Sequence, residues 1–147
     1  MEKAIFDTSV WVDFSKGIEN PQSLKLEDYL NNFPMQLFLT PTILQEFLMG
    51  LRHESDFLKY KFQFQYLNLL KPDWEKTLIA AAKLYFDLRK KGVTIRKSTD
   101  CLIAQIAIEN DVLLVHLDAD FELIAQEILK MKGSNCWEGD LEQMRLD

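Results

Sequence analysis

Residues 1–14 read "MEKAIFDTSVWVDF", an apolar run that ends on an acid and then resumes. The run at 3–6 predicts a short buried strand, and "TSVWVDFSKG" at 8–17 predicts a helix that closes near Gly17. Parallel α/β sheets bind ligands beyond the carboxyl ends of their strands. Asp7, which ends the strand, is therefore a candidate ligand residue, although an acid here can also simply begin a turn.

Predicted strands and helices continue to alternate along the rest of the chain. Strands are predicted at 35–40 ("MQLFLT"), 112–117 ("VLLVHL") and 135–137 ("NCW"). Helices are predicted between Pro21 and Pro34, from Thr40 through Leu51, and at 73–92, 98–108 and 121–133. Continuous apolar strands that alternate with helices indicate an α/β fold. We expect a single domain with a central parallel sheet of four to five short strands flanked by helices.

Residues 55–70 fit two periodicities. Tyr60, Phe62, Phe64 and Tyr66 alternate as in a strand, yet the run is long enough for a helix. We expect a helix followed by a short extended piece at 67–70. Core packing is the ordinary role of such aromatic residues, and the alternative is an exposed apolar patch that receives a partner.

The totals limit the class of protein. A chain of 147 residues, 48% of them hydrophobic, fits one domain with a substantial core. Seventeen Lys and Arg against 23 Asp and Glu give a net charge of −6. This charge argues mildly against a protein that nucleic acid covers over most of its surface, but it does not exclude a local basic groove. Cys101 and Cys136 match no zinc or disulfide pattern. We expect a reduced, cytoplasmic protein without signal peptide or membrane span.

Four acids stand where predicted elements begin or end. Asp7 and Asp118 follow strands, Asp100 opens the helix at 98–108, and Glu46 lies in the second turn of the helix that begins at Thr40. All four adjoin apolar core at one edge of the predicted sheet. Carboxylates that are buried close together repel one another and destabilise the fold unless a cation compensates.

Each acid also has a simpler explanation. Asp100 alone is a typical first-turn acid favoured by the helix dipole, and Glu46 could be a solvated helix acid. Asp118 or Asp120 could cap the helix at Phe121, and for Asp120 capping explains the residue at least as well as metal binding. Taken together, the acids favour a metal site. Carboxylates without His or Cys select Mg²⁺, with Mn²⁺ as a substitute, and such a site can hydrolyse a phosphodiester.

Four stretches resemble, in order and spacing, the acidic motifs of the PIN-domain family, and most closely its small VapC-type toxins. These stretches are "IFDTSVWVDF" (5–14), "PTILQEFLMGL" (41–51), "STDCLIAQIAIEND" (98–111) and "LLVHLDADFELIA" (113–125). The resemblance covers most of the chain and implies a PIN domain over 1–147, with a last strand and an acidic tail in about 134–147.

The resemblance also implies a function, a Mg²⁺-dependent endoribonuclease that is the toxin of a type II toxin–antitoxin pair. It implies a cognate antitoxin and an RNA substrate as partners, and a homodimer with partner contacts near 57–66. The catalytic and metal-binding acids it implies are Asp7, Glu46, Asp100 and Asp118, with Asp120 as an additional candidate ligand and Thr8 or Ser9 as the supporting hydroxyl.

An RNase also needs a cationic path for phosphates. Arg96 and Lys97, close to Asp100, and Arg52, after the Glu46 helix, are the best candidates. For 89–91, solvation and interaction with a helix C-terminus are an equal alternative. His116, just before the fourth motif, is a lone histidine at a strand end, which is more often structural than a ligand.

Two other functions fit parts of the pattern. A catalytically inactive PIN-like module that binds RNA or protein would usually have lost an acid, whereas all four are present. A phosphatase with an aspartate nucleophile would have a second Asp two residues after Asp7, but position 9 is Ser. The sequence identifies neither the RNA nor the antitoxin, and it leaves the number of metal ions open.

Overall fold

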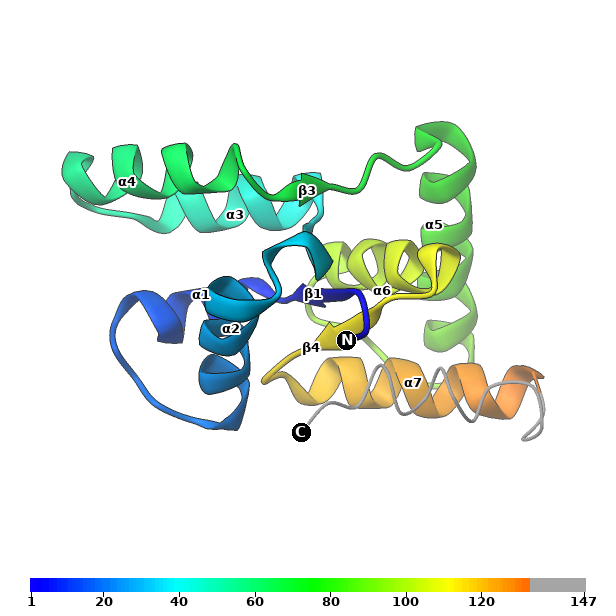
Figure 1. Ribbon diagram of the computed structural model, residues 1–147. Coiled ribbons are helices and arrows are strands. Elements are labelled where there is room, and N and C mark those ends of the chain that lie inside the picture. Colours follow the sequence, from blue (N-terminus) through cyan, green and yellow to red (C-terminus); the bar gives the residue numbers. More distant parts are fainter. Residues whose placement is uncertain (133–147) are drawn as a thin grey trace.

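The computed structural model describes residues 1–132, with side chains through Glu127. Four parallel strands form one sheet in this part of the chain (Figure 1), in the order β3-β2-β1-β4. Their bounds are β1 (Ala4–Phe6), β2 (Leu37–Leu39), β3 (Asn68–Leu69) and β4 (Leu113–Val115). Every residue of β1 and β4 is buried, which explains their uninterrupted apolar sequences. The predicted parallel α/β fold is confirmed. The strand expected at 135–137, Cys136 and the acidic tail lie outside the described residues.

Helices fill the intervals between the strands. They are α1 (Thr8–Ser15), α2 (Pro21–Asn32), α3 (Pro41–Gly50), α4 (Glu54–Phe64), α5 (Trp74–Lys90), α6 (Ser98–Asn110) and α7 (Ala119–Lys132), with a 3₁₀ turn, η1, at Pro34–Gln36. Residues 35 and 36 thus belong to the turn rather than to β2, because Pro34 starts a tight turn in which the Gln36 N–H donates to Phe33 O at 3.0 Å.

Two of the predicted helix ends are formed as expected. The Thr40 hydroxyl accepts from the Ile43 N–H at 3.1 Å and caps α3. Gly92, just past α5, has a φ of +83°, a left-handed conformation that glycine adopts without strain. Asp73 occupies the N-cap position of α5, but its side chain makes no capping hydrogen bond.

An aromatic cluster fixes α1 against α3 and α4. The fully buried Trp11 ring lies 6.0 Å from that of Phe47 and 4.9 Å from that of Phe64, centroid to centroid. In Figure 1, α3 and α4 run along the top of the molecule and α7 along the bottom, with β1 and β4 between them. Because α1 follows β1 after one residue, this packing sets α3 beside the end of β1.

The aromatic run in α4 divides between two faces, which confirms a helix. Tyr60 and Phe64 are each 5% exposed, whereas Phe62 is 62% and Tyr66 72% exposed. The exposed pair stack on each other with ring centroids 5.2 Å apart. None of the helices within 1–132 combines the length and the apolar character needed to cross a membrane.

Candidate active site

The order of the strands places a topological switch point at the carboxyl end of the sheet. The chain leaves β1 toward β2 on one side and returns to β4 on the other, and ligands bind in α/β sheets at such a switch point. Asp7 directly follows β1, and Asp118 comes three residues after β4. The Asp7 N–H donates to Val115 O at 2.9 Å, which extends the pairing of β1 and β4 to this edge.

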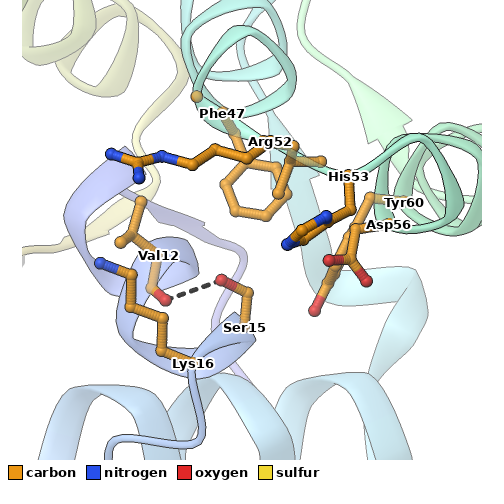
Figure 2. Close-up of a pocket in the computed structure, with 10 residues that line it drawn as sticks. Val12, Ser15, Lys16, Phe47, Arg52, His53, Asp56 and Tyr60 are labelled. Atoms are coloured by element: carbon orange, nitrogen blue, oxygen red, sulfur yellow. Dashed lines mark hydrogen bonds between the residues drawn. The ribbon is translucent and has the colours of Figure 1, made fainter.

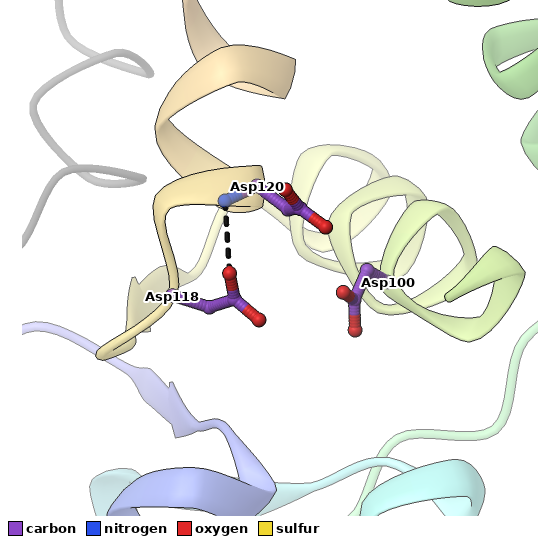
Figure 3. Close-up of side chains that lie close together, drawn as sticks. All are labelled: Asp100, Asp118 and Asp120. Atoms are coloured by element: carbon purple, nitrogen blue, oxygen red, sulfur yellow. Dashed lines mark hydrogen bonds between the residues drawn. The ribbon is translucent and has the colours of Figure 1, made fainter. Parts of the chain in front are cut away.

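Three acids meet beside this edge (Figure 3). One oxygen each from Asp100, Asp118 and Asp120, which we call the acid trio, lie within 4.8 Å of one another. Asp100 comes from the first turn of α6, and the other two from the start of α7. Asp100 is only 5% exposed and Asp120 only 7%. The Asp100 Oδ2 atom is buried without a hydrogen-bond partner among the described residues, which suits a bound cation.

Asp7 and Glu46 complete the acidic region without belonging to the trio. The Ser9 hydroxyl donates to Asp7 Oδ2 at 2.8 Å, and the Thr8 hydroxyl donates to Glu46 Oε1 at 3.3 Å. Both hydroxyls implied by the family resemblance therefore contact an acid. Asp7 is also the N-cap of α1, through a longer contact from the Ser9 N–H.

The acids lie close enough to perturb one another's ionisation. Burial raises the pKa of Asp100 to about 7, and the negative charge of Asp7 is the next largest cause. Burial, followed by the charge of Asp7, also raises the pKa of Glu46. The positive charge of Lys97 opposes both shifts. A divalent cation would relieve this crowding, and a set of carboxylate oxygens fits Mg²⁺ or Mn²⁺.

Asp118 and Asp120 each hold local contacts as well. Asp118 Oδ1 accepts from the Asp120 N–H at 2.9 Å, so Asp118 makes the capping bond at the start of α7 and Asp120 does not. Arg96, predicted to contact RNA, forms ion pairs with both acids. Its Nη2 lies 3.0 Å from Asp118 Oδ1 and its Nε 3.2 Å from Asp120 Oδ2, while its side chain stays 74% exposed.

Arg52 lines a pocket of about 510 Å³ between α1 and the α3–α4 connection (Figure 2). Val12 and Gly50 in this pocket each lie four residues past the Thr8–Glu46 contact, so the pocket begins about one helical turn from the acids. Lys16 also lines it. Sequence reasoning missed Lys16 because only the packing of α1 on α3 brings it near Arg52, 36 positions away.

Two further side chains near the site, His116 and Cys101, are buried. His116 is 4% exposed, and its ring lies 5.2 Å from that of Phe121, in agreement with a structural role. Cys101 is buried, and burial raises the pKa of its thiol to about 11. A thiol that stays protonated is a poor nucleophile and metal ligand.

Comparison with known proteins fits this arrangement. Residues 4–127 match the PIN domain family. The chain belongs to the PIN-domain family. This PIN domain is 30% identical over 122 residues to a VapC ribonuclease of Mycobacterium bovis and to ribonuclease VapC11 of Mycobacterium tuberculosis, an alignment that spans 83% of this chain and 91% of each relative. The resemblance carried by the four acidic motifs is therefore confirmed.

A solved structure shares the fold. VapBC2 from Rickettsia felis, determined bound to a DNA fragment from its promoter, contains a chain that superimposes on this PIN domain with a TM-score of 0.64. The match covers 82% of this chain and 92% of that chain at 21% sequence identity. At this identity the likeness concerns the fold alone.

Proposed function

We propose that this PIN domain is a metal-dependent endoribonuclease and the toxin of a toxin–antitoxin pair. The observation that carries the proposal is Asp100, whose Oδ2 is buried and unpartnered and whose carboxylate lies beside those of Asp118 and Asp120. The name ribonuclease, borne by relatives that align over most of the chain, supports the reaction class. The presence of all four acids argues against the alternative, an inactive module that binds RNA or protein.

In this proposal Mg²⁺, or Mn²⁺ in its place, is held by Asp7, Asp100 and Asp118, with Glu46 and Asp120 as further candidate ligands. When bound, the ion supplies positive charge that orients a phosphodiester and makes a water molecule easier to deprotonate. Ser9 and Thr8 fix the orientation of Asp7 and Glu46 by holding one oxygen of each.

Glu46 is also suited to move a proton. Thr8 occupies its Oε1, which leaves Oε2 to accept the proton of the attacking water. Burial and the charge of Asp7 raise its pKa, which makes the Glu46 carboxylate a stronger base than an ordinary glutamate. We therefore count Glu46, with Asp7, Asp100 and Asp118, among the catalytic acids.

The RNA path in this proposal runs from the acids toward the pocket in Figure 2. Lys97 acts electrostatically on both Asp100 and Glu46, so it lies beside the reacting phosphate. Arg52 and Lys16 would take phosphates about one helical turn further on. Lys97→Met and Arg52→Met should each weaken RNA binding. Each should also reduce the slope of the logarithm of RNA affinity against the logarithm of salt concentration by about one. An unchanged salt slope would remove these residues from the path.

We also propose two protein partners, a second copy of this chain and a cognate antitoxin. The neighbour from Rickettsia felis is a complex of two proteins, which supports an antitoxin. Phe62 on α4 and Tyr66, in the turn just after it, form an exposed pair that offers one apolar contact surface. Helix α5 offers another through its exposed Trp74, Leu78, Ile79 and Phe86. As an RNase of the cell's own RNA, the protein would act in the cytoplasm.

Cleavage of a mixed RNA pool by the purified, antitoxin-free protein tests the proposed function. We expect cutting with Mg²⁺ or Mn²⁺, none with EDTA, and a loss of at least about 100-fold in Asp7→Asn and Asp100→Asn. Glu27→Gln, an exposed acid on α2, serves as the matched control and should cut normally. A folded wild type that is inert with either metal would favour the inactive binding module. Cutting that persists in both aspartate variants would show that the site is wrong.

A further inference from the structure

Arg96 has an unusual set of contacts for an exposed side chain beside an active site. Its Nη2 donates to Asp118 Oδ1 at 3.0 Å, and its Nε donates to Asp120 Oδ2 at 3.2 Å. The Arg96 backbone N–H donates to the same Asp120 oxygen, also at 3.2 Å. One residue, at the end of the connection between α5 and α6, thus holds two acids that follow β4.

The guanidinium binds the oxygens that the backbone already holds. Asp118 Oδ1 accepts from the Asp120 N–H, and Asp120 Oδ2 accepts from the Arg96 N–H. The opposite oxygens, Asp118 Oδ2 and Asp120 Oδ1, accept no hydrogen bond from any residue in the described part of the chain. Together with the unpartnered Asp100 Oδ2, each member of the trio keeps one oxygen for a ligand.

The exposure of Arg96 distinguishes two possible roles. A side chain that competed with a metal ion would lie between the three acids and be buried there. The Arg96 side chain is instead 74% exposed, against 10% for the Asp120 side chain, and it makes no hydrogen bond to Asp100. The guanidinium therefore lies on the solvent side of the trio and leaves the space between the acids clear.

We propose that Arg96 is a positioning residue for the metal site, a clamp that turns one free oxygen each of Asp118 and Asp120 toward Asp100. The planar fork of a guanidinium suits this task because two of its donors can hold two carboxylates at fixed positions. Its charge also offsets the mutual repulsion of the two acids. The inference rests on the proposed metal-dependent function and assigns Arg96 a role other than contact with RNA.

Binding of Mn²⁺ alone to the full-length protein tests this role without any activity assay. Free Mn²⁺ is followed by its EPR signal during titration, and circular dichroism checks that each variant is folded. Outer-shell partners of metal ligands are typically worth about 10- to 100-fold in metal affinity. We expect that loss in Arg96→Met, and also in Arg96→Lys, which keeps the charge but cannot hold both acids.

Lys97→Met is the matched control, because it removes the same charge from the next residue. Without a clamp to lose, it should bind Mn²⁺ as tightly as the wild type or more tightly. Arg96→Met that behaves like this control would overturn the inference, since Arg96 would then merely oppose the metal charge. Full affinity in Arg96→Lys alone would also overturn it, because charge rather than the fork would be sufficient.

Asp100→Asn separates failure of the inference from failure of the proposed function. If the wild type and Asp100→Asn bind Mn²⁺ equally, the trio is no metal site and both proposals fall. If Asp100→Asn loses affinity and Arg96→Met does not, the metal site stands and the clamp alone is refuted.

Discussion

A carboxyl group with a raised pKa stabilises a folded protein only while it is protonated. The pKa of Asp100 is about 7 in the fold, against an ordinary value of 3.8, so the folded state holds the proton more tightly than the unfolded state. The free energy of unfolding should therefore fall as the pH rises from about 4 to about 7. At the scale of this residue, burial of the Asp100 carboxylate makes the fold less stable at neutral and higher pH.

Asp100→Asn should remove this dependence, because the amide has the same shape and cannot ionise. In EDTA at pH 8 we expect the variant to be more stable than the wild type by about 1–3 kcal/mol, and the difference to vanish near pH 4. Urea unfolding across this pH range measures it. Glu27→Gln, an exposed acid, should show no such gain. Parallel pH profiles for the wild type and Asp100→Asn would contradict the expectation.

Part of the site could be predicted from single residues and part could not. The positions of Asp7 and Asp118 at one edge of the sheet could be predicted, because each follows a buried strand and the ends of parallel strands share an edge, although β4 ends at Val115, three residues before Asp118. The clamp by Arg96 could not be predicted, because it depends on the path of the chain between α5 and α6. Arg96 and Asp120 are 24 positions apart, and no local spacing links them.

At the scale of the element, α4 shows why an alternating pattern is ambiguous. Aromatic residues at every second position fit the two sides of a strand, but in a helix they also fit two opposite faces, because positions four apart lie together. Tyr60 and Phe64 form the buried face, and Phe62 lies on the exposed one, with Tyr66 exposed in the turn just after the helix. The length of the run at 55–70, rather than its periodicity, favours the helix.

The two faces of α4 should respond differently to truncation of the same residue type. Phe64→Ala removes a ring that packs on Trp11 and Phe47, so we expect a loss of about 3–5 kcal/mol in the free energy of unfolding. Phe62→Ala should change it by less than about 0.5 kcal/mol. Urea unfolding at low protein concentration measures both values. Equal losses would show that α4 is not packed as described.

Phe62 should matter for assembly instead. Light scattering with the antitoxin present and absent should show that Phe62→Ala weakens one of the two complexes, because the variant removes half of an exposed aromatic pair. Normal assembly in both cases would remove this face of α4 from the proposed interfaces.

At the scale of the whole molecule, segments far apart in sequence meet at one edge of the sheet. The chain carries a net charge of −6, yet the trio, Asp7 and Glu46 gather where an RNA phosphate would have to approach. In the proposed function, a cation of high charge density would reconcile this crowding with a polyanionic substrate. We therefore expect these acids to hold a divalent metal ion.

Anomalous diffraction from crystals of the wild type soaked in Mn²⁺ tests that claim most directly. We expect one strong peak in contact with Asp100 and Asp118, with Arg96 still on the outer oxygens of Asp118 and Asp120. Crystals of Asp100→Asn soaked in the same way should lack the peak. Density for Mn²⁺ only at other surface acids, or none at all in a well-ordered site, would contradict the claim.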